Sequence, residues 1–287
     1  MMDFHAQNER VLGLLSRYLT FTPRAVNRED VISLARDTEE GDAYAFSVLM
    51  AEAMGLDIAD NRFDLALFLD YLLPMTECLD PEEFRRDAYY RTVRPAPGRH
   101  GNWEIRYQTY ASCEAFVAGD MRQLPDGRIL PRIGFFLEEF PYPAVLEDVR
   151  EWMTVTTNEI LTMRQPISRA RGRVAAYGLG LGYFAFMAAE KDCVDSVTVV
   201  ERDGDAIRLF RENLLPHFPN GQKIRILQGD ALEFQKNLSP ADYDFVFADI
   251  WHDVADGLPL YRELKRHEKP GAEYAYWIED TLKCYEM

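Results

Sequence analysis

The spacing of apolar and polar positions gives the first part of the chain a helical character. Over residues 1–95 apolar side chains recur at intervals of three or four, which is typical of helices that pack one face on a core. The stretch 63–73 is almost continuously apolar and predicts a buried helix that ends before Pro74. Residues 80–83 combine an N-cap aspartate, a first-turn proline and a glutamate, so they predict another helix start. We therefore expect a helical amino-terminal region.

Beyond a proline- and glycine-rich break at 95–101, the pattern changes to that of strands. Segments 103–110, 114–121 and 129–138 have strand character, and a Pro-Asp-Gly turn connects the last two. We expect these three strands to pair as a small antiparallel sheet within residues 102–140.

Residues 141–172 connect this predicted sheet to the rest of the chain. Thr156 and Glu159 have the spacing of a capping box, which predicts a helix from there through Met163, bent or ended by Pro166. Glu159 has a second interpretation as a residue that lines a substrate pocket.

From residue 173 to the end at 287, strands and helices alternate. The pattern predicts strands at 174–177, 197–201, 224–228, 243–249 and 273–278, with helices at 183–190, 205–215 and 258–267. Alternation of this kind requires crossover connections, so the fold class is α/β with a Rossmann-like, doubly wound parallel sheet. Only nine residues follow Ile278, too few for two further strands, so the fifth strand should lie at a sheet edge. We expect the amino-terminal region or a second subunit, as in a homodimer, to cover that edge.

The ends of these predicted strands carry the candidate site, because ligands of such sheets bind beyond the carboxyl ends of the strands. A loop with three glycines follows the first strand, and acids end or follow the second, third and fourth; these residues are Gly178, Gly180, Gly182, Glu201, Asp230 and Asp249. Glycines let a ligand approach the backbone, and the start of the following helix offers free N–H groups to a carboxylate or phosphate. Glu201 is placed to accept both ribose hydroxyls. The set predicts a ligand that contains adenosine.

Two adenosine ligands compete, a nicotinamide dinucleotide and S-adenosylmethionine. Gly180, Gly182 and Ala185 satisfy the permissive dinucleotide motif, but the turn begins at Gly178, which places Tyr183 where that motif needs a small residue. Asp230 and Ala231 add a carboxylate and a small residue suited to adenine. This combination favours S-adenosylmethionine.

Residues 249–253 combine two acids, a histidine and a tryptophan, which makes them the segment best suited to catalysis. Asp249 or His252 can take a proton from an acceptor, Trp251 can wall an apolar or cationic acceptor, and Asp253 adds a second acid. The alternative is structural: Asp249 caps the loop, Trp251 packs in the core and His252 faces solvent. Two acids and one histidine are too few ligands to predict a metal site.

Composition restricts the partners. The 48 Asp and Glu against 32 Lys and Arg give a formal net charge of −16, which disfavours nucleic acid and favours a small cationic or neutral substrate. The four cysteines are widely spaced, without a C-x-x-C pair, which fits a reducing cytoplasm. The start lacks the apolar run of a signal peptide, and the longest uncharged stretch, 174–189, is shorter than a membrane span. We expect a cytoplasmic protein with no membrane partner.

From about residue 141 onward, the sequence resembles the spermidine-synthase-like branch of the class I S-adenosylmethionine-dependent methyltransferases. The resemblance is carried by YGLGLGYF at 177–184, VTVVERD at 197–203, QGDALEF at 228–234 and YDFVFADIWHD at 243–253. It implies that Glu201 binds the ribose, that Asp230 lies near adenine, that the glycine loop contacts the methionine moiety and that Asp249 lies at the reaction edge. The segment 158–160 resembles one that lines the cofactor cleft in spermidine synthases, which places Glu159 there.

Two departures separate this chain from aminopropyltransferases. Leu181 stands where a GGGDG pattern has its aspartate, and Asp249 and Asp253 are four residues apart instead of three. We therefore expect a methyltransferase that acts on a small acceptor such as an amine. An aminopropyltransferase and a nucleotide-binding protein without catalytic activity are the alternatives.

Overall fold

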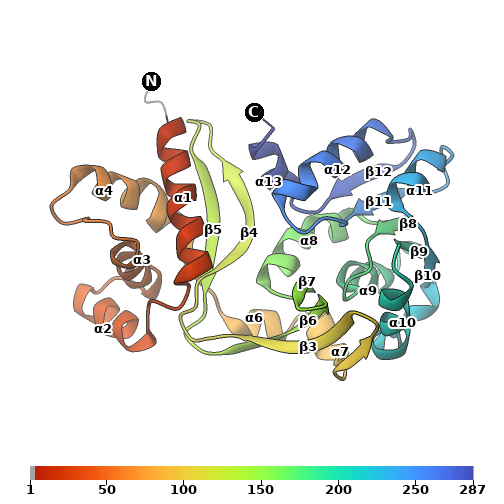
Figure 1. The fold of residues 1–287 in the computed structure, drawn as a ribbon, viewed down its shortest axis with the longest axis horizontal. Helices are drawn as coiled ribbons and strands as arrows, with labels where there is room; N and C mark the ends of the chain where they lie inside the picture. The colour runs from red at the N-terminus through yellow and green to blue at the C-terminus, as the bar shows by residue number, and fades with distance from the viewer. Residues whose placement is uncertain (1–3, 287) are drawn as a thin grey trace. The chain divides into compact units, whose positions relative to one another are not determined.

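The computed structural model describes residues 4–286, and the chain forms two compact units (Figure 1). The first unit comprises Met1–Pro81 and Thr109–Pro141, and the second comprises Glu82–Gln108 and Tyr142–Met287. No helix among the described residues is long and apolar enough to cross a bilayer.

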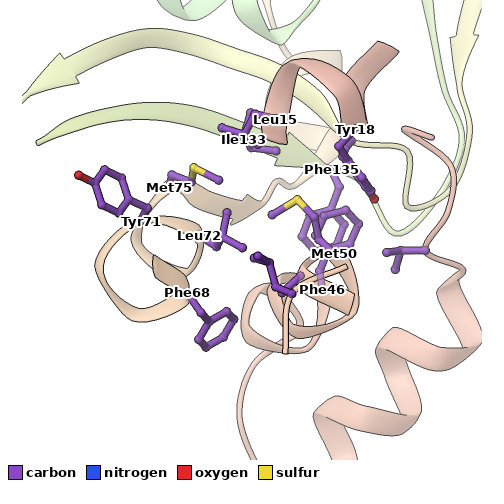
Figure 2. Close-up of a cluster of buried hydrophobic side chains, with 14 of the residues drawn as sticks. Leu15, Tyr18, Phe46, Met50, Phe68, Tyr71, Leu72, Met75, Ile133 and Phe135 are labelled. Atoms are coloured by element: carbon purple, nitrogen blue, oxygen red, sulfur yellow. The ribbon is translucent and has the colours of Figure 1, made fainter. Parts of the chain in front are cut away.

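The first unit combines helices with a three-stranded sheet. Its elements are α1 (His5–Phe21), α2 (Arg28–Thr38), α3 (Asp42–Ala53), α4 (Arg62–Leu67), the π-helix η1 (Phe68–Leu72), α5 (Leu73–Met75), β1 (Thr76–Cys78), β4 (Phe116–Gln123) and β5 (Ile129–Phe135). The strands lie in the order β1-β5-β4, with β1 parallel and β4 antiparallel to β5. Figure 2 shows the core between helices and sheet, where Phe46 and Phe135 stack at a centroid distance of 4.0 Å.

The helix predicted to end before Pro74 instead continues through it to Met75 as α4, η1 and α5. Proline has no N–H to donate to the carbonyl four residues earlier, so the oxygen of Asp70 needs another donor. The Nη1 of Arg128 supplies it at 2.9 Å. The prediction of full burial was also wrong, because Phe63 is 64% and Leu69 53% exposed. The short strand β1 was not predicted.

The second unit begins with two short helices and a four-stranded sheet. These are α6 (Pro81–Arg85), α7 (Ala88–Thr92), β2 (Gly98–His100), β3 (Trp103–Tyr110), β6 (Phe140–Glu147) and β7 (Arg150–Thr154), with the sheet order β2-β3-β6-β7. The helix start at 80–83 and the three predicted strands are present, but the strands do not form one sheet. β4 and β5 pair in the first unit, whereas β3 belongs to this four-stranded sheet.

A five-stranded parallel sheet completes the second unit and confirms the predicted Rossmann-like fold class. Its elements are α8 (Thr157–Arg169), β8 (Gly172–Tyr177), α9 (Tyr183–Ala189), β9 (Val194–Glu201), α10 (Gly204–Asn213), β10 (Ile224–Gln228), α11 (Ala231–Asn237), β11 (Phe245–Ala248), α12 (Val254–Arg266), β12 (Glu273–Tyr276) and α13 (Glu279–Cys284). The order is β10-β9-β8-β11-β12, and every pair is parallel. Neither α11 nor α13 was predicted.

The fifth strand, β12, lies at the edge of this sheet as predicted, and α8 supplies part of its cover. α8 runs through Pro166 to Arg169 instead of ending at the proline. Arg169 donates through Nη2 to the Tyr274 carbonyl at 3.1 Å and through Nε to Glu273 at 2.7 Å. A side chain of α8 thus satisfies a backbone acceptor on the edge strand. Cover by the amino-terminal region or a second subunit stays a prediction.

Candidate functional site

A cavity lies at the carboxyl edge of the parallel sheet, and every strand of that sheet ends on one of its lining residues. In sheet order these are Asp230 after β10, Glu201 at the end of β9, Gly178 after β8, Asp249 after β11 and Trp277 after β12. The register keeps the strand ends level, because Tyr177 lies opposite both Val200 and Ala248. Parallel pairing therefore brings together residues that are up to 99 positions apart in the sequence.

The three loop glycines are each required by a close approach. Gly178 (φ 93°) and Gly180 (φ 47°) line the cavity, and a Cβ on them would lie 1.9 Å from the Asp249 carbonyl oxygen and the Met153 sulfur, respectively. At Gly182 (φ 73°) a Cβ would lie 2.4 Å from the ring of Phe210. Gly182 thus serves the packing of α9 against α10, and the structure does not place it on the cavity wall.

The backbone N–H groups of this loop are largely used inside the protein. Four of the five residues at 178–182 donate to other groups of the protein. Gly178 donates to the Val200 carbonyl at 3.0 Å and Gly182 to the Leu179 carbonyl at 2.8 Å. Leu179 donates to the Oε2 of Glu201 and Leu181 to the sulfur of Met153, both at 3.2 Å. The loop therefore does not present the row of donors that a pyrophosphate uses.

Glu201 is held rigidly at the end of β9. Its Oε1 accepts from the Asp203 N–H at 2.9 Å and its Oε2 from the Leu179 N–H at 3.2 Å. Burial raises its pKa, while these backbone donors oppose the shift. Each carboxylate oxygen has two lone pairs, so the carboxylate can still accept from a ligand hydroxyl. A pair of vicinal ribose hydroxyls fits this arrangement.

Asp230 and Ala231 line the cavity beside Glu201, as predicted. Asp230 is also the N-cap of α11, and its Oδ1 accepts from the Glu233 N–H at 2.9 Å. The cap fixes the carboxylate and leaves Oδ2 for an amino group such as that of adenine.

Glu159 and Asp249 form a pair of acids inside the cavity. Thr156 is the N-cap of α8, but its side chain makes no capping hydrogen bond, so the predicted capping box was wrong. Glu159 instead lines the cavity with 7% of its surface exposed, and its Oε2 lacks a hydrogen-bond partner among the described residues. Burial and then repulsion from Asp249 raise the pKa of Glu159 well above its ordinary value, and burial raises the pKa of Asp249 to about 7. Two close acids in a dry site hold a proton or attract a cation.

Some residues of the segment 249–253 line the cavity, and others only hold neighbouring elements in place. Trp251 lines the cavity at 4% exposure, together with Asp249. His252 places its Nε2 2.9 Å from the Glu151 carbonyl oxygen, and Asp253 forms a true capping box that starts α12, accepting from Ala255 at 2.7 Å. Neither of these two lines the cavity. The structure therefore places Asp249 and Trp251 at the cavity and makes Asp253 the N-cap of α12.

Several lining residues come from elements outside the strand ends: Trp103 on β3, Trp152 and Met153 on β7, and Leu260 on α12. From the sequence, Trp152 and Met153 can be interpreted as a lid or as core residues, whereas Trp103 and Leu260 were missed. Trp277 directly follows β12, but the predicted strand ran one residue past it. Leu181, singled out as the replacement for an acid, is fully buried and does not line the cavity.

Acidic groups outnumber basic groups on the cavity wall. Four carboxyl groups line it, from Glu159, Glu201, Asp230 and Asp249, against one guanidinium, from Arg202. Within residues 4–286 no group of three His, Cys, Asp or Glu side chains is arranged to hold a metal ion. The wall thus favours a cationic ligand over a polyanionic one.

Comparison with known proteins gives only partial overlaps. No family model and no curated protein matches the sequence. A putative O-methyltransferase from Klebsiella pneumoniae is 24% identical with a TM-score of 0.28, over 36% of this chain and 47% of that one. A probable spermidine synthase from Corynebacterium glutamicum is 16% identical with a TM-score of 0.41, over 64% of each chain. The spermidine synthase from Thermotoga maritima is 16% identical with a TM-score of 0.38, over 63% of this chain and 55% of that one.

The chain thus covers less than two thirds of the length of each of these solved structures. The fold assignment rests on the molecule's own strand order, in which the sequence of strands reverses between β8 and β11 and places a ligand crevice at their carboxyl ends. By that criterion the chain is an α/β protein with a Rossmann-like, doubly wound parallel sheet.

Proposed function

We propose that this cavity binds S-adenosylmethionine and that the protein transfers its methyl group to a small amine. The observation that carries the proposal is the series of residues at the five strand ends, which consists of three acids, one glycine and one tryptophan. Their order divides the cavity. The ends of β10, β9 and β8 form a cofactor half around Asp230, Glu201 and Gly178. The ends of β11 and β12 form an acceptor half with Asp249, Trp251 and Trp277, completed by Glu159 from α8.

The residues of the cofactor half fit the sulfonium cofactor better than a dinucleotide. A pyrophosphate needs free backbone N–H groups, but most loop donors are used internally, and it would face four carboxylates. S-adenosylmethionine carries a positive sulfonium and an ammonium group, which suit that wall. The orphan Oε2 of Glu159 marks a place where a ligand donor is needed.

The acceptor half can hold and deprotonate an amine. When bound, S-adenosylmethionine supplies an electrophilic methyl group, and transfer is an in-line displacement that depends mainly on positioning. Asp249, with its pKa raised to about 7 by burial, is near the ideal for a general base at neutral pH. It takes the proton of an ammonium, which leaves the nitrogen lone pair free to attack. Glu159 then orients the amine from α8.

Aminopropyl transfer is a second candidate, because the same two acids would also hold the amine acceptor of that reaction. Leu181 does not exclude this reaction, since its side chain is buried away from the cavity. A protein that binds the cofactor without turnover is the remaining alternative.

The test offers S-adenosylmethionine or its decarboxylated form together with amines, including putrescine and spermidine, and identifies the products by mass. S-adenosylhomocysteine with a methylated amine supports the proposal, whereas methylthioadenosine with an aminopropylated amine overturns it. Asp249→Asn should lose turnover. Glu212→Gln is the matched control, because it removes a charge from a side chain that is 57% exposed and outside the cavity. Cofactor binding without any product would favour the non-catalytic alternative.

A further inference from the structure

All four tryptophans of the chain line this one cavity. They come from separate parts of the second unit: Trp103 from β3, Trp152 from β7, Trp251 after β11 and Trp277 after β12. Trp103 and Trp152 stand nearly perpendicular, at 82° with ring centroids 6.0 Å apart. Aromatic walls beside carboxylates are the surroundings in which proteins recognise alkylated ammonium ions.

The two indoles of the acceptor half are fixed before any ligand arrives. Trp277 donates through Nε1 to the Thr162 hydroxyl of α8 at 3.1 Å. Trp251 lies roughly parallel to Tyr276, at 21° and 6.5 Å, and a Cβ on Gly257 would lie 2.8 Å from its Cδ1. Both rings are thus held in place by neighbours, which reduces the entropy lost when a ligand binds.

The balance of polar and aromatic groups indicates what kind of amine fits. A primary ammonium has three N–H donors and needs as many acceptors. In an N-methylated ammonium, methyl groups replace some or all of these donors and surround the charged nitrogen with an apolar surface. The acceptor half presents two carboxyl groups, from Glu159 and Asp249, beside the two indoles. Methyl groups on nitrogen would contact the ring faces, and the charge would be balanced by the acids.

We propose that the acceptor is an amine that already carries N-alkyl groups, so that the product is a more highly methylated or quaternary ammonium; this rests on the proposed function. The nitrogen lone pair forms the bond to the methyl carbon, and the carbon–sulfur bond breaks with its electron pair going to sulfur. The sulfonium becomes a neutral thioether, and the positive charge moves to nitrogen. A secondary or tertiary ammonium first gives one proton to Asp249, which frees the lone pair. The product then keeps one N–H proton if the amine was secondary and none if it was tertiary.

Three small probes that share one skeleton test this inference: choline, ethanolamine and 3,3-dimethylbutan-1-ol. They differ in N-methylation and charge, and binding is followed by intrinsic fluorescence because every tryptophan lies at the cavity. With S-adenosylhomocysteine present, choline should bind at least about fivefold more tightly than either other probe. Equal affinity for choline and 3,3-dimethylbutan-1-ol, or tighter binding of ethanolamine, would overturn the proposal.

Variants at Trp277 separate the aromatic face from simple apolar packing. Trp277→Leu should weaken choline binding about tenfold, while Trp277→Phe should retain most of it. Tyr285→Leu, at an aromatic residue that does not line the cavity, is the control. Equal choline affinity in folded Trp277→Leu and wild type would contradict the aromatic role.

Calorimetry of S-adenosylhomocysteine on the same samples keeps the two proposals distinguishable. If it binds and choline shows no preference, only this inference fails. If it does not bind wild type, the proposed function fails, and any choline site loses its assignment as an acceptor site.

Discussion

Replacing Glu201 tests the cofactor half at its most defined position. The Glu201→Ala variant removes the carboxylate that ends β9, whose two oxygens accept from the Asp203 and Leu179 N–H groups at 2.9 and 3.2 Å. If its remaining lone pairs bind the ribose hydroxyls, the loss of a charged acceptor costs about 1.5 to 3 kcal/mol. That range corresponds to roughly 10- to 150-fold weaker binding.

Isothermal titration calorimetry with S-adenosylhomocysteine measures this loss, and thermal unfolding reports whether the variant is folded. Glu201→Gln serves as a second variant, since it keeps the size and one acceptor oxygen for the loop, and it should fall between Ala and wild type. Glu212→Ala removes an equal charge from α10 outside the cavity and should bind as wild type does. Unchanged affinity in folded Glu201→Ala would refute the ribose assignment.

Three further perturbations address the acids, the glycine loop and the cap. Turnover of an amine should rise with pH through about 7 as Asp249 ionises, as a pH–rate profile would show. Between the ordinary carboxyl pKa and about 7, Asp249 is protonated in the folded state but ionised in the unfolded state, so the stability of the protein falls as the pH rises. Asp249→Asn removes this ionisation and should therefore raise the thermal unfolding midpoint at alkaline pH. A lowered midpoint would contradict the burial of Asp249 as the cause of its raised pKa. Gly180→Ala should abolish cofactor binding measured by calorimetry, because the new Cβ would lie 1.9 Å from the Met153 sulfur. Adding Met153→Ala should restore part of the binding. If it restores none, the positive φ of 47° at residue 180, and not the contact with Met153, is the cause of the loss. Asp253→Ala should cost about 1 kcal/mol in denaturant unfolding through loss of the α12 cap, and a more than tenfold loss of turnover would reinstate it as a catalytic residue.

The strand-end residues were predictable because parallel pairing follows from the alternation of strands and helices. Once five parallel strands are recognised, Glu201, Asp230 and Asp249 must share one edge of the sheet. The cavity's other wall was not predictable in this way. Met153 contacts the glycine loop from β7 of the four-stranded sheet, and Trp103 lines the cavity from β3, but no local pattern reports that packing.

Local capping patterns misled in both directions, because the same residue types serve caps and sites. Thr156 and Glu159 have the spacing of a capping box, yet Glu159 is buried in the cavity. The sequence predicted Asp253 as a catalytic acid, but it caps α12 in a capping box with Asp256. Burial decides between these roles, and burial depends on tertiary packing that a short motif does not contain.

We infer that the cavity is a site for a sulfonium nucleoside and not for a dinucleotide, and a calorimetric titration of the wild-type protein with S-adenosylmethionine and with NAD measures this preference. The loop donors used internally and the four carboxylates of the wall predict saturable binding of S-adenosylmethionine and at least about tenfold weaker binding of NAD. Tighter binding of NAD, or no binding of S-adenosylmethionine to the folded protein, would contradict the claim.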